Sequence, residues 1–182
     1  MKDELKKSVW VAFLRGINVG GHHKVPMADL KATLADMGFS DIKTLLNSGN
    51  LVFTTESTDI AAVEEQMAQV LEKKFGFPIP VIIKKMDALT NAVAENPFTN
   101  IQKHQDLQFY VTFVREDPQE GIGWGTPDGS FQVMGAKEGM VFSLLDLSRS
   151  RTVDAMKLLE KTYTKDITTR NWNTILKLLQ MA

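Results

Sequence analysis

The chain has 182 residues, of which 43% are hydrophobic and 24% charged, and its formal charge at pH 7 is -1. This composition is ordinary for a folded globular protein, and the balanced charge excludes a large basic surface for duplex nucleic acid or an anionic membrane. Cysteine is absent, which excludes disulfides, thiolate nucleophiles and cysteine-type zinc sites. No apolar run approaches the roughly 20 residues of a membrane span, so we expect a cytoplasmic protein.

The first half of the chain predicts the order strand, helix, strand, strand, helix, strand. The first helix begins at Pro26, which suits the first helical position, and Gly38 is expected to stop it. The second is expected to be capped by the Ser57-Thr58-Asp59 segment. The predicted strands are residues 9–14, 41–46, 51–55 and 80–84. This order predicts a ferredoxin-like βαββαβ fold with two helices on one face of an antiparallel sheet.

The second half predicts a smaller α+β part. The Asn96–Asn100 segment is the expected boundary, which gives domains 1–96 and 97–182. A helix is predicted before it at 86–95. After it we expect a strand at 107–114, a loop at 116–129, a hairpin of strands 131–134 and 140–145 around Gly135–Gly139, and helices at 152–163 and 170–181.

The stretch between the first strand and the first helix is rich in glycine and carries anion-pairing side chains. Its candidate ligand residues are Arg15, Asn18, Gly20, Gly21 and Lys24. Backbone N–H groups ahead of a helix favour a phosphate or carboxylate. The spacing matches neither a Walker A loop nor a GxGxxG motif. The same residues also suit a glycine-rich turn whose polar side chains satisfy nearby carbonyl groups, and spacing alone favours that turn.

Two further stretches carry candidate residues. Thr168–Thr174 predicts a threonine-capped helix whose first turn presents Arg170, Asn171 and Asn173. Spacing alone favours a plain capped helix with a surface arginine over a ligand site. Ser48 and Asn50 lie in a predicted hairpin turn, and Ser48 has no recognisable base to activate it. The pair His22-His23 lacks an acidic partner at ligand spacing, so we predict no metal site.

The three stretches Leu14–Gly21, Ser48–Phe53 and Thr168–Thr174, in this order, resemble a bacterial family known only as a domain of unknown function. The resemblance covers nearly the whole chain and implies an α+β fold with a ferredoxin-like N-terminal part. It implies no activity, cofactor or catalytic residue. The hallmark residues of this family are mostly Arg, Asn, Gly and Ser, which favours a binding pocket over packing alone. With the resemblance included, a ligand pocket and a purely structural role are equally well supported.

We therefore expect the three stretches to converge on a polar cleft between the halves, where Arg15, Lys24 and Arg170 pair with a small anionic ligand. Two alternatives stay open: a nucleic-acid-binding module, against which the balanced charge weighs, and a structural or protein-interaction role with no small ligand. The sequence fixes no reaction, cofactor or oligomeric state.

Overall fold

The computed structural model of the chain describes residues 7–115, 123–163 and 166–181. The chain divides into two compact units. The N-terminal unit comprises the residues up to Leu89 together with those from Lys177 onward, and the C-terminal unit runs from Thr90 to Leu176. Within the N-terminal unit, Lys43 Nζ donates a hydrogen bond to the carbonyl oxygen of Met181. The last residues of the chain therefore belong with the first.

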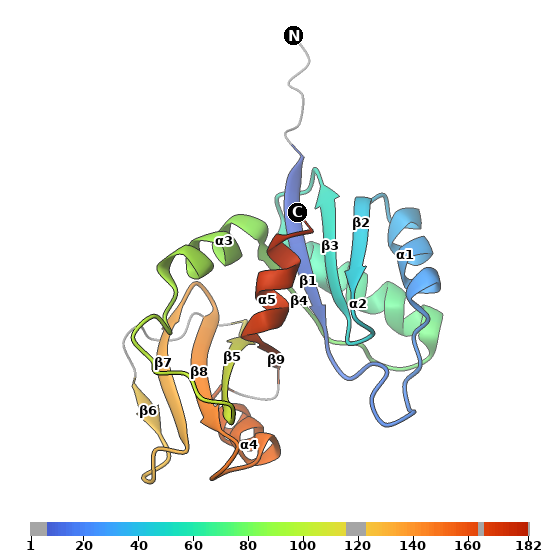
Figure 1. Cartoon of the computed structure of the whole chain (residues 1–182). Helices are drawn as coiled ribbons and strands as arrows, with labels where there is room; N and C mark the ends of the chain where they lie inside the picture. The colour runs from blue at the N-terminus through green and yellow to red at the C-terminus, as the bar shows by residue number, and fades with distance from the viewer. Residues whose placement is uncertain (1–6, 116–122, 164–165, 182) are drawn as a thin grey trace. The chain divides into compact units, whose positions relative to one another are not determined.

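The N-terminal unit has the predicted order of strands and helices (Figure 1). Its elements are β1 (Ser8–Leu14), α1 (Met27–Asp36), β2 (Ser40–Leu45), β3 (Asn50–Thr55), α2 (Ile60–Phe75) and β4 (Val81–Lys85). The strands form one sheet in the order β2-β3-β1-β4, in which every neighbouring pair is antiparallel. This is the ferredoxin-like arrangement, and the prediction of the fold is confirmed.

The core of this unit lies between the sheet and the two helices. In β1, Trp10, Ala12 and Leu14 alternate onto the face that α1 and α2 cover. The helices contribute residues at helical spacing, which are Leu30 and Leu34 from α1 and Val63, Met67 and Leu71 from α2. Burial of this apolar surface is the main force that fixes β1, and hence the loop that follows it, in place.

The termini of the two helices follow ordinary capping rules. The side chain of Asp59 accepts a hydrogen bond from the N–H of Ala62, and Gly76 ends α2 in the left-handed region at φ 83°. Pro26 lies at the N-cap of α1 and not at the first helical position, so this detail of the prediction is wrong by one residue. Gly38 follows α1 with φ 89°, as expected of a helix stop.

A side chain from α2 forms a hydrogen bond with the backbone of β4, the edge strand of the sheet. The carboxylate Oε1 of Glu64 accepts a hydrogen bond from the N–H of Ile83 at 2.6 Å. We expect Glu64→Ala to lower the free energy of unfolding by about 1–3 kcal/mol, because the N–H of buried Ile83 loses its partner. Glu64→Gln, which keeps an acceptor oxygen, should recover most of this loss in a urea titration.

The matched control is Glu65→Ala, whose exposed carboxylate bonds Gln69 on the same helix. We expect it to change the free energy of unfolding by less than about 0.5 kcal/mol. If the Glu64 and Glu65 variants were equally stable, the edge hydrogen bond would have no energetic role.

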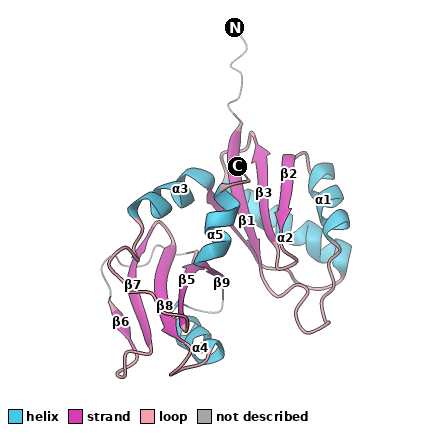
Figure 2. Ribbon diagram, viewed as in Figure 1, coloured by secondary structure: helices cyan, strands magenta, loops and turns pink. Residues whose placement is uncertain are grey.

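The C-terminal unit contains one antiparallel sheet of order β6-β7-β8-β5-β9 (Figure 2). Its elements, with the helices that begin or end in the other unit, are α3 (Met86–Glu95), β5 (Leu107–Phe113), β6 (Trp124–Gly125), β7 (Phe131–Lys137), β8 (Met140–Asp146), α4 (Thr152–Tyr163), β9 (Thr168–Asn171) and α5 (Trp172–Leu179). The helix α4 covers one face over Phe131, Val141 and Leu145. The aromatic rings of Phe98, Phe109, Phe142 and Trp172 pack together elsewhere in the unit.

Two predictions for this sheet are wrong in detail. The strand β7 continues to Lys137 through a register shift between Val133 and Gly135, so the hairpin turn is shorter than expected. A β-bulge accommodates the extra residue without ending the strand. Within the predicted loop 116–129, Trp124 and Gly125 pair with β7, while residues 116–122 lie outside the described residues.

The prediction that a helix begins at Arg170 is also wrong. Residues Thr168–Asn171 form β9, which pairs antiparallel with β5, and the hydroxyl groups of Thr169 and Thr112 lie 2.8 Å apart across the two strands. The β-branched threonines favour this extended conformation. The helix begins at Trp172, and Asn171 Oδ1 accepts the N–H of Asn173 at 2.9 Å in the manner of an N-cap. On α5 the buried residues are Trp172, Ile175 and Leu178.

Candidate functional site

The loop between β1 and α1 forms a small hairpin of its own. The N–H of Asn18 donates to the carbonyl of His23, and the N–H of His22 donates to the carbonyl of Val19, both at 3.0 Å. Gly20 and Gly21 are the central residues of this turn, with φ 58° and 79°. Positive φ at both central positions is the requirement of a tight type I′ turn, which explains the pair of glycines.

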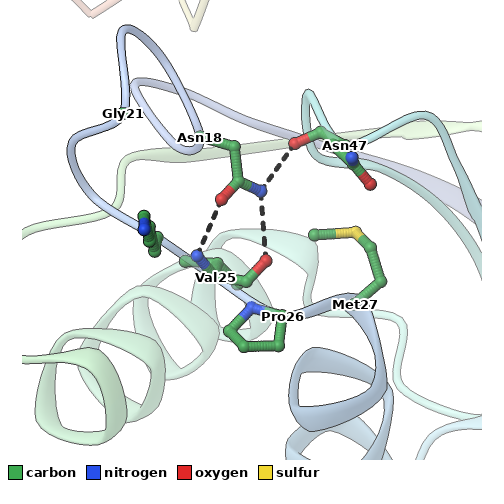
Figure 3. A pocket seen from close by; sticks show the side chains of 7 residues that line it. Asn18, Gly21, Val25, Pro26, Met27 and Asn47 are labelled. Carbon is green, nitrogen blue, oxygen red and sulfur yellow. Dashed lines mark hydrogen bonds between the residues drawn. The ribbon is translucent and has the colours of Figure 1, made fainter.

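The side chain of Asn18 connects this loop to the turn between β2 and β3. Its Nδ2 donates to the carbonyl oxygens of Val25 at 3.0 Å and of Asn47 at 2.8 Å, and its Oδ1 accepts the N–H of Val25 at 2.8 Å (Figure 3). Asn18 itself has φ 54°, a conformation that asparagine tolerates better than most residues. Two stretches far apart in the sequence therefore meet at one amide group.

A pocket opens beside this amide. Its volume is about 410 Å³, within the range of small-molecule sites. It is lined by Asn18, Gly21, Lys24, Val25, Pro26, Met27 and Asn47. Three of these, Asn18, Gly21 and Lys24, are residues that the sequence predicts as ligand-binding. Pro26 and Met27 belong to the same sequence stretch, and Asn47 precedes the predicted Ser48. Their position next to candidate residues was the only feature of the sequence that indicated a place in the pocket.

The turn between β2 and β3 is held by Asn50 and Gly49. The fully buried Asn50 donates from Nδ2 to the carbonyl of Leu45 and to Ser48 Oγ, both at 3.0 Å. The carbonyl of Gly49 accepts the N–H of Leu14 at 2.8 Å. The turn is thereby fixed against the end of β1, and Ser48 Oγ serves as an acceptor within it.

The basic residues of the β1–α1 loop differ in their surroundings. Lys24 is exposed and lines the pocket. Arg15 is half-buried, and its backbone N–H donates to the carbonyl of Pro80 at 3.0 Å. The ring of His23 stacks on Phe77 with centroids 4.3 Å apart, and its Nδ1 lies 3.1 Å from the carbonyl oxygen of Gly16. His23 therefore holds the loop, and Lys24 is the cation of the pocket lining.

The third predicted stretch belongs to the C-terminal unit. Arg170 Nη1 donates to Thr168 Oγ1 at 2.7 Å and to the carbonyl of Thr169 at 3.0 Å. Burial lowers the pKa of Arg170 to about 10, so the guanidinium remains charged at neutral pH. Asn171 Nδ2 donates to Gln108 Oε1 at 3.1 Å, across β9 and β5. These contacts stabilise the edge of the sheet.

Two carboxylates with shifted pKa values lie in the C-terminal unit, Asp128 in a turn and Asp146 at the end of β8. Hydrogen bonds from the Thr126 hydroxyl and from Ser130 lower the pKa of Asp128 to about 2. The hydroxyl of Ser148 lowers the pKa of Asp146 in the same way. Both groups are therefore ionised at neutral pH and do not suit a general acid.

Neither a metal-binding cluster nor a membrane-spanning helix occurs in the described part of the chain. Within residues 7–115, 123–163 and 166–181, no group of three or more histidine or acidic side chains is arranged to hold a metal ion. In the same described ranges, no helix has the length and apolar character needed to cross a membrane.

Fold and pocket together define an α+β protein with a pocket between the β1–α1 loop and the β2–β3 turn of its ferredoxin-like unit. The family model described as "Protein of unknown function (DUF1697)" matches residues 8–122, more than half of the chain, and the chain therefore belongs to this family. The expected membership in a family of unknown function is confirmed. The matched residues end before the Thr168–Thr174 stretch.

The chain is similar in structure to the conserved bacterial protein SP0830 from Streptococcus pneumoniae, with a TM-score of 0.73 and 22% sequence identity. That similarity covers 97% of this chain and 99% of the other. At this level of identity it concerns the fold alone. None of the curated proteins matches the chain.

Proposed function

We propose that the pocket beside β1 binds a small anionic ligand that carries a phosphate or a carboxylate. The observation that carries this proposal is the position of Lys24, an exposed cation in the lining of a cavity of about 410 Å³. The sequence from residue 15 to residue 28 contains no acidic side chain, so nothing in this loop neutralises that charge. A cation beside a preformed cavity favours an anion at low ionic strength.

The start of α1 also borders the pocket. Met27, the first residue of the helix, lines the pocket, and Pro26 at the N-cap provides no side-chain hydrogen bond to the first turn. Backbone N–H groups at a helix start carry partial positive charge, and Asp29 in the first turn of α1 offsets part of it, so Lys24 remains the main source of positive charge at the pocket. It stays a prediction that the same ligand also contacts Arg15, Arg170, Asn171 and Asn173.

A purely structural role for the hallmark asparagines is the second candidate. The observation that favours it is that the amide of Asn18 bonds to backbone groups of Val25 and Asn47, so the hallmark residue holds two loops together. The two candidates differ in what Lys24 does. If the asparagines are purely structural, Lys24 has no role, whereas ligand binding requires its positive charge.

The test is titration of the purified protein with phosphate-bearing and carboxylate-bearing small molecules, followed through the amide NMR signals of Gly20 and Gly21. We expect Lys24→Gln to weaken anion binding about threefold or more without changing the free energy of unfolding. Added salt should weaken binding to the wild type as well.

The matched control is Lys31→Gln, an exposed lysine on α1 that does not line the pocket, which should bind as the wild type does. Equal binding by the Lys24 and Lys31 variants, or no binding by any anion in the panel, would leave the structural role as the better account.

A further inference from the structure

The pocket is larger than a simple anion needs. A volume of about 410 Å³ corresponds to roughly a dozen water-sized groups at about 30 Å³ each. Inorganic phosphate or acetate would fill only a fraction of that space. Solvent or a further part of the ligand occupies the remaining volume.

Part of the pocket lining is apolar. Pro26 is exposed and Met27 is half-buried, and both line the cavity beside the buried Val25. In Figure 3 the Met27 side chain extends from the start of α1 toward the hydrogen-bonded Asn18 and Asn47. A methionine side chain is flexible and polarisable, so it adapts to apolar groups of different shapes. Such walls favour an apolar group over ordered water.

A second observation comes from the surface next to the lining. Val19 and Leu46, at 68% and 54% exposure, are the most exposed large apolar residues in the described part of the chain. Val19 follows Asn18 and Leu46 precedes Asn47, the two residues whose hydrogen bond joins the loops. Leu46 also has φ 60°, a conformation that costs a leucine energy. Each of these exposed apolar side chains belongs to a sequence neighbour of a residue that lines the pocket.

We propose that the natural ligand is an amphipathic anion, in which the phosphate or carboxylate is joined to an apolar group about the size of an aromatic ring. This proposal rests on the proposed function above. Lys24 holds the charged group, and the apolar group lies against Pro26 and Met27. Val19 and Leu46 extend the apolar surface outward for longer ligands.

Matched pairs of ligands test this proposal. We expect phenyl phosphate to bind roughly tenfold or more tightly than inorganic phosphate, and phenylacetate similarly more tightly than acetate, because only the aryl compounds remove apolar surface from water. Tighter binding of phenyl phosphate than of phenylacetate indicates a phosphate ligand, and the reverse order indicates a carboxylate ligand. Benzyl alcohol, which has the ring but no charge, should bind more weakly than either aryl anion. Isothermal titration calorimetry gives the dissociation constants.

Two variants locate the apolar contact. Met27→Gln should reduce the preference for phenyl phosphate several-fold and leave inorganic phosphate unaffected. The control Met37→Gln changes a half-buried methionine at the other end of α1 and should leave both constants unchanged. Leu46→Asn suits the left-handed backbone, so it should fold well and weaken binding of aryl anions with longer substituents. Leu147→Asn is its control, an exposed leucine in the C-terminal unit.

The outcomes separate the two proposals. Equal affinities for phenyl phosphate and inorganic phosphate would overturn the amphipathic ligand and leave anion binding standing. Benzyl alcohol bound as tightly as phenyl phosphate, or no binding by any anion, would overturn the proposed function itself. A tenfold preference for phenyl phosphate over inorganic phosphate that is lost in Met27→Gln but kept in Met37→Gln would support both the proposed function and the amphipathic ligand.

Discussion

Replacing Gly49 with alanine should be the most destabilising single-methyl change in the N-terminal unit. Gly49 has φ 79°, and a Cβ at this position would lie 2.6 Å from Leu14 Cβ and 3.0 Å from Ile17 Cδ1. Both neighbours are buried, so neither can move freely. Backbone strain and overpacking together should lower the free energy of unfolding by about 2–5 kcal/mol, measured by urea titration.

The matched control for this change is Gly20→Ala. Gly20 also has positive φ, at 58°, but no atom lies within 4 Å of the Cβ position. Its substitution therefore introduces the backbone strain without the collision and should cost about 1 kcal/mol. The difference between the two variants measures the close approach of the β2–β3 turn to the end of β1. Equal losses would mean that this approach is not rigid.

The second large effect is expected for Asn18→Ala. The substitution removes three hydrogen bonds to backbone groups of Val25 and Asn47 and places an alanine at φ 54°. We expect a loss of about 2–4 kcal/mol in the free energy of unfolding. Asn18→Gly loses the same bonds but accepts the backbone conformation, so it should be more stable than the alanine variant.

Asn91→Ala is the control, because Asn91 is exposed on α3 and alanine favours a helix more strongly than asparagine does. It should leave stability unchanged or slightly raise it. A loss below about 1 kcal/mol for Asn18→Ala would show that the loops are joined by other contacts. It would also weaken the case that the pocket is preformed.

The fold of the N-terminal unit was predictable because its signals are local and agree with one another. The run Val9–Leu14 is continuous and apolar, Asp59 and Gly76 mark the ends of α2, and the helices repeat their apolar residues at helical spacing. Given six elements in that order, few arrangements bury all the apolar faces. The pairing order of the sheet follows from that restriction.

The error at Thr168–Asn171 has a physical cause of a different kind. A threonine followed by polar residues and an amphipathic run is an ordinary helix start, and Asn171 does cap α5. What the sequence could not reveal is that β5 offers an open edge with Thr112 opposite Thr169. A tertiary partner thus overrode a local preference and delayed the helix to Trp172.

The candidate site was predicted in part for a similar reason. Asn18, Gly21 and Lys24 stood out because glycine, amide and cation occur together between a strand and a helix. The hydrogen bond from Asn18 to Asn47 joins residues 29 positions apart, and no spacing rule gives it. The exposed Val19 and Leu46 also carried no signal, since an apolar residue in a sequence indicates burial first.

The boundary between the units falls inside α5, so the residues from Lys177 onward belong with strands made at the start of synthesis. Chains generally fold from the N-terminus while still on the ribosome. The unit that carries the pocket cannot be completed before residue 181 has been added, and until then Lys43 lacks the carbonyl of Met181. The N-terminal unit is therefore completed only after residues 177–181 have been made, although its residues up to Leu89 are translated first.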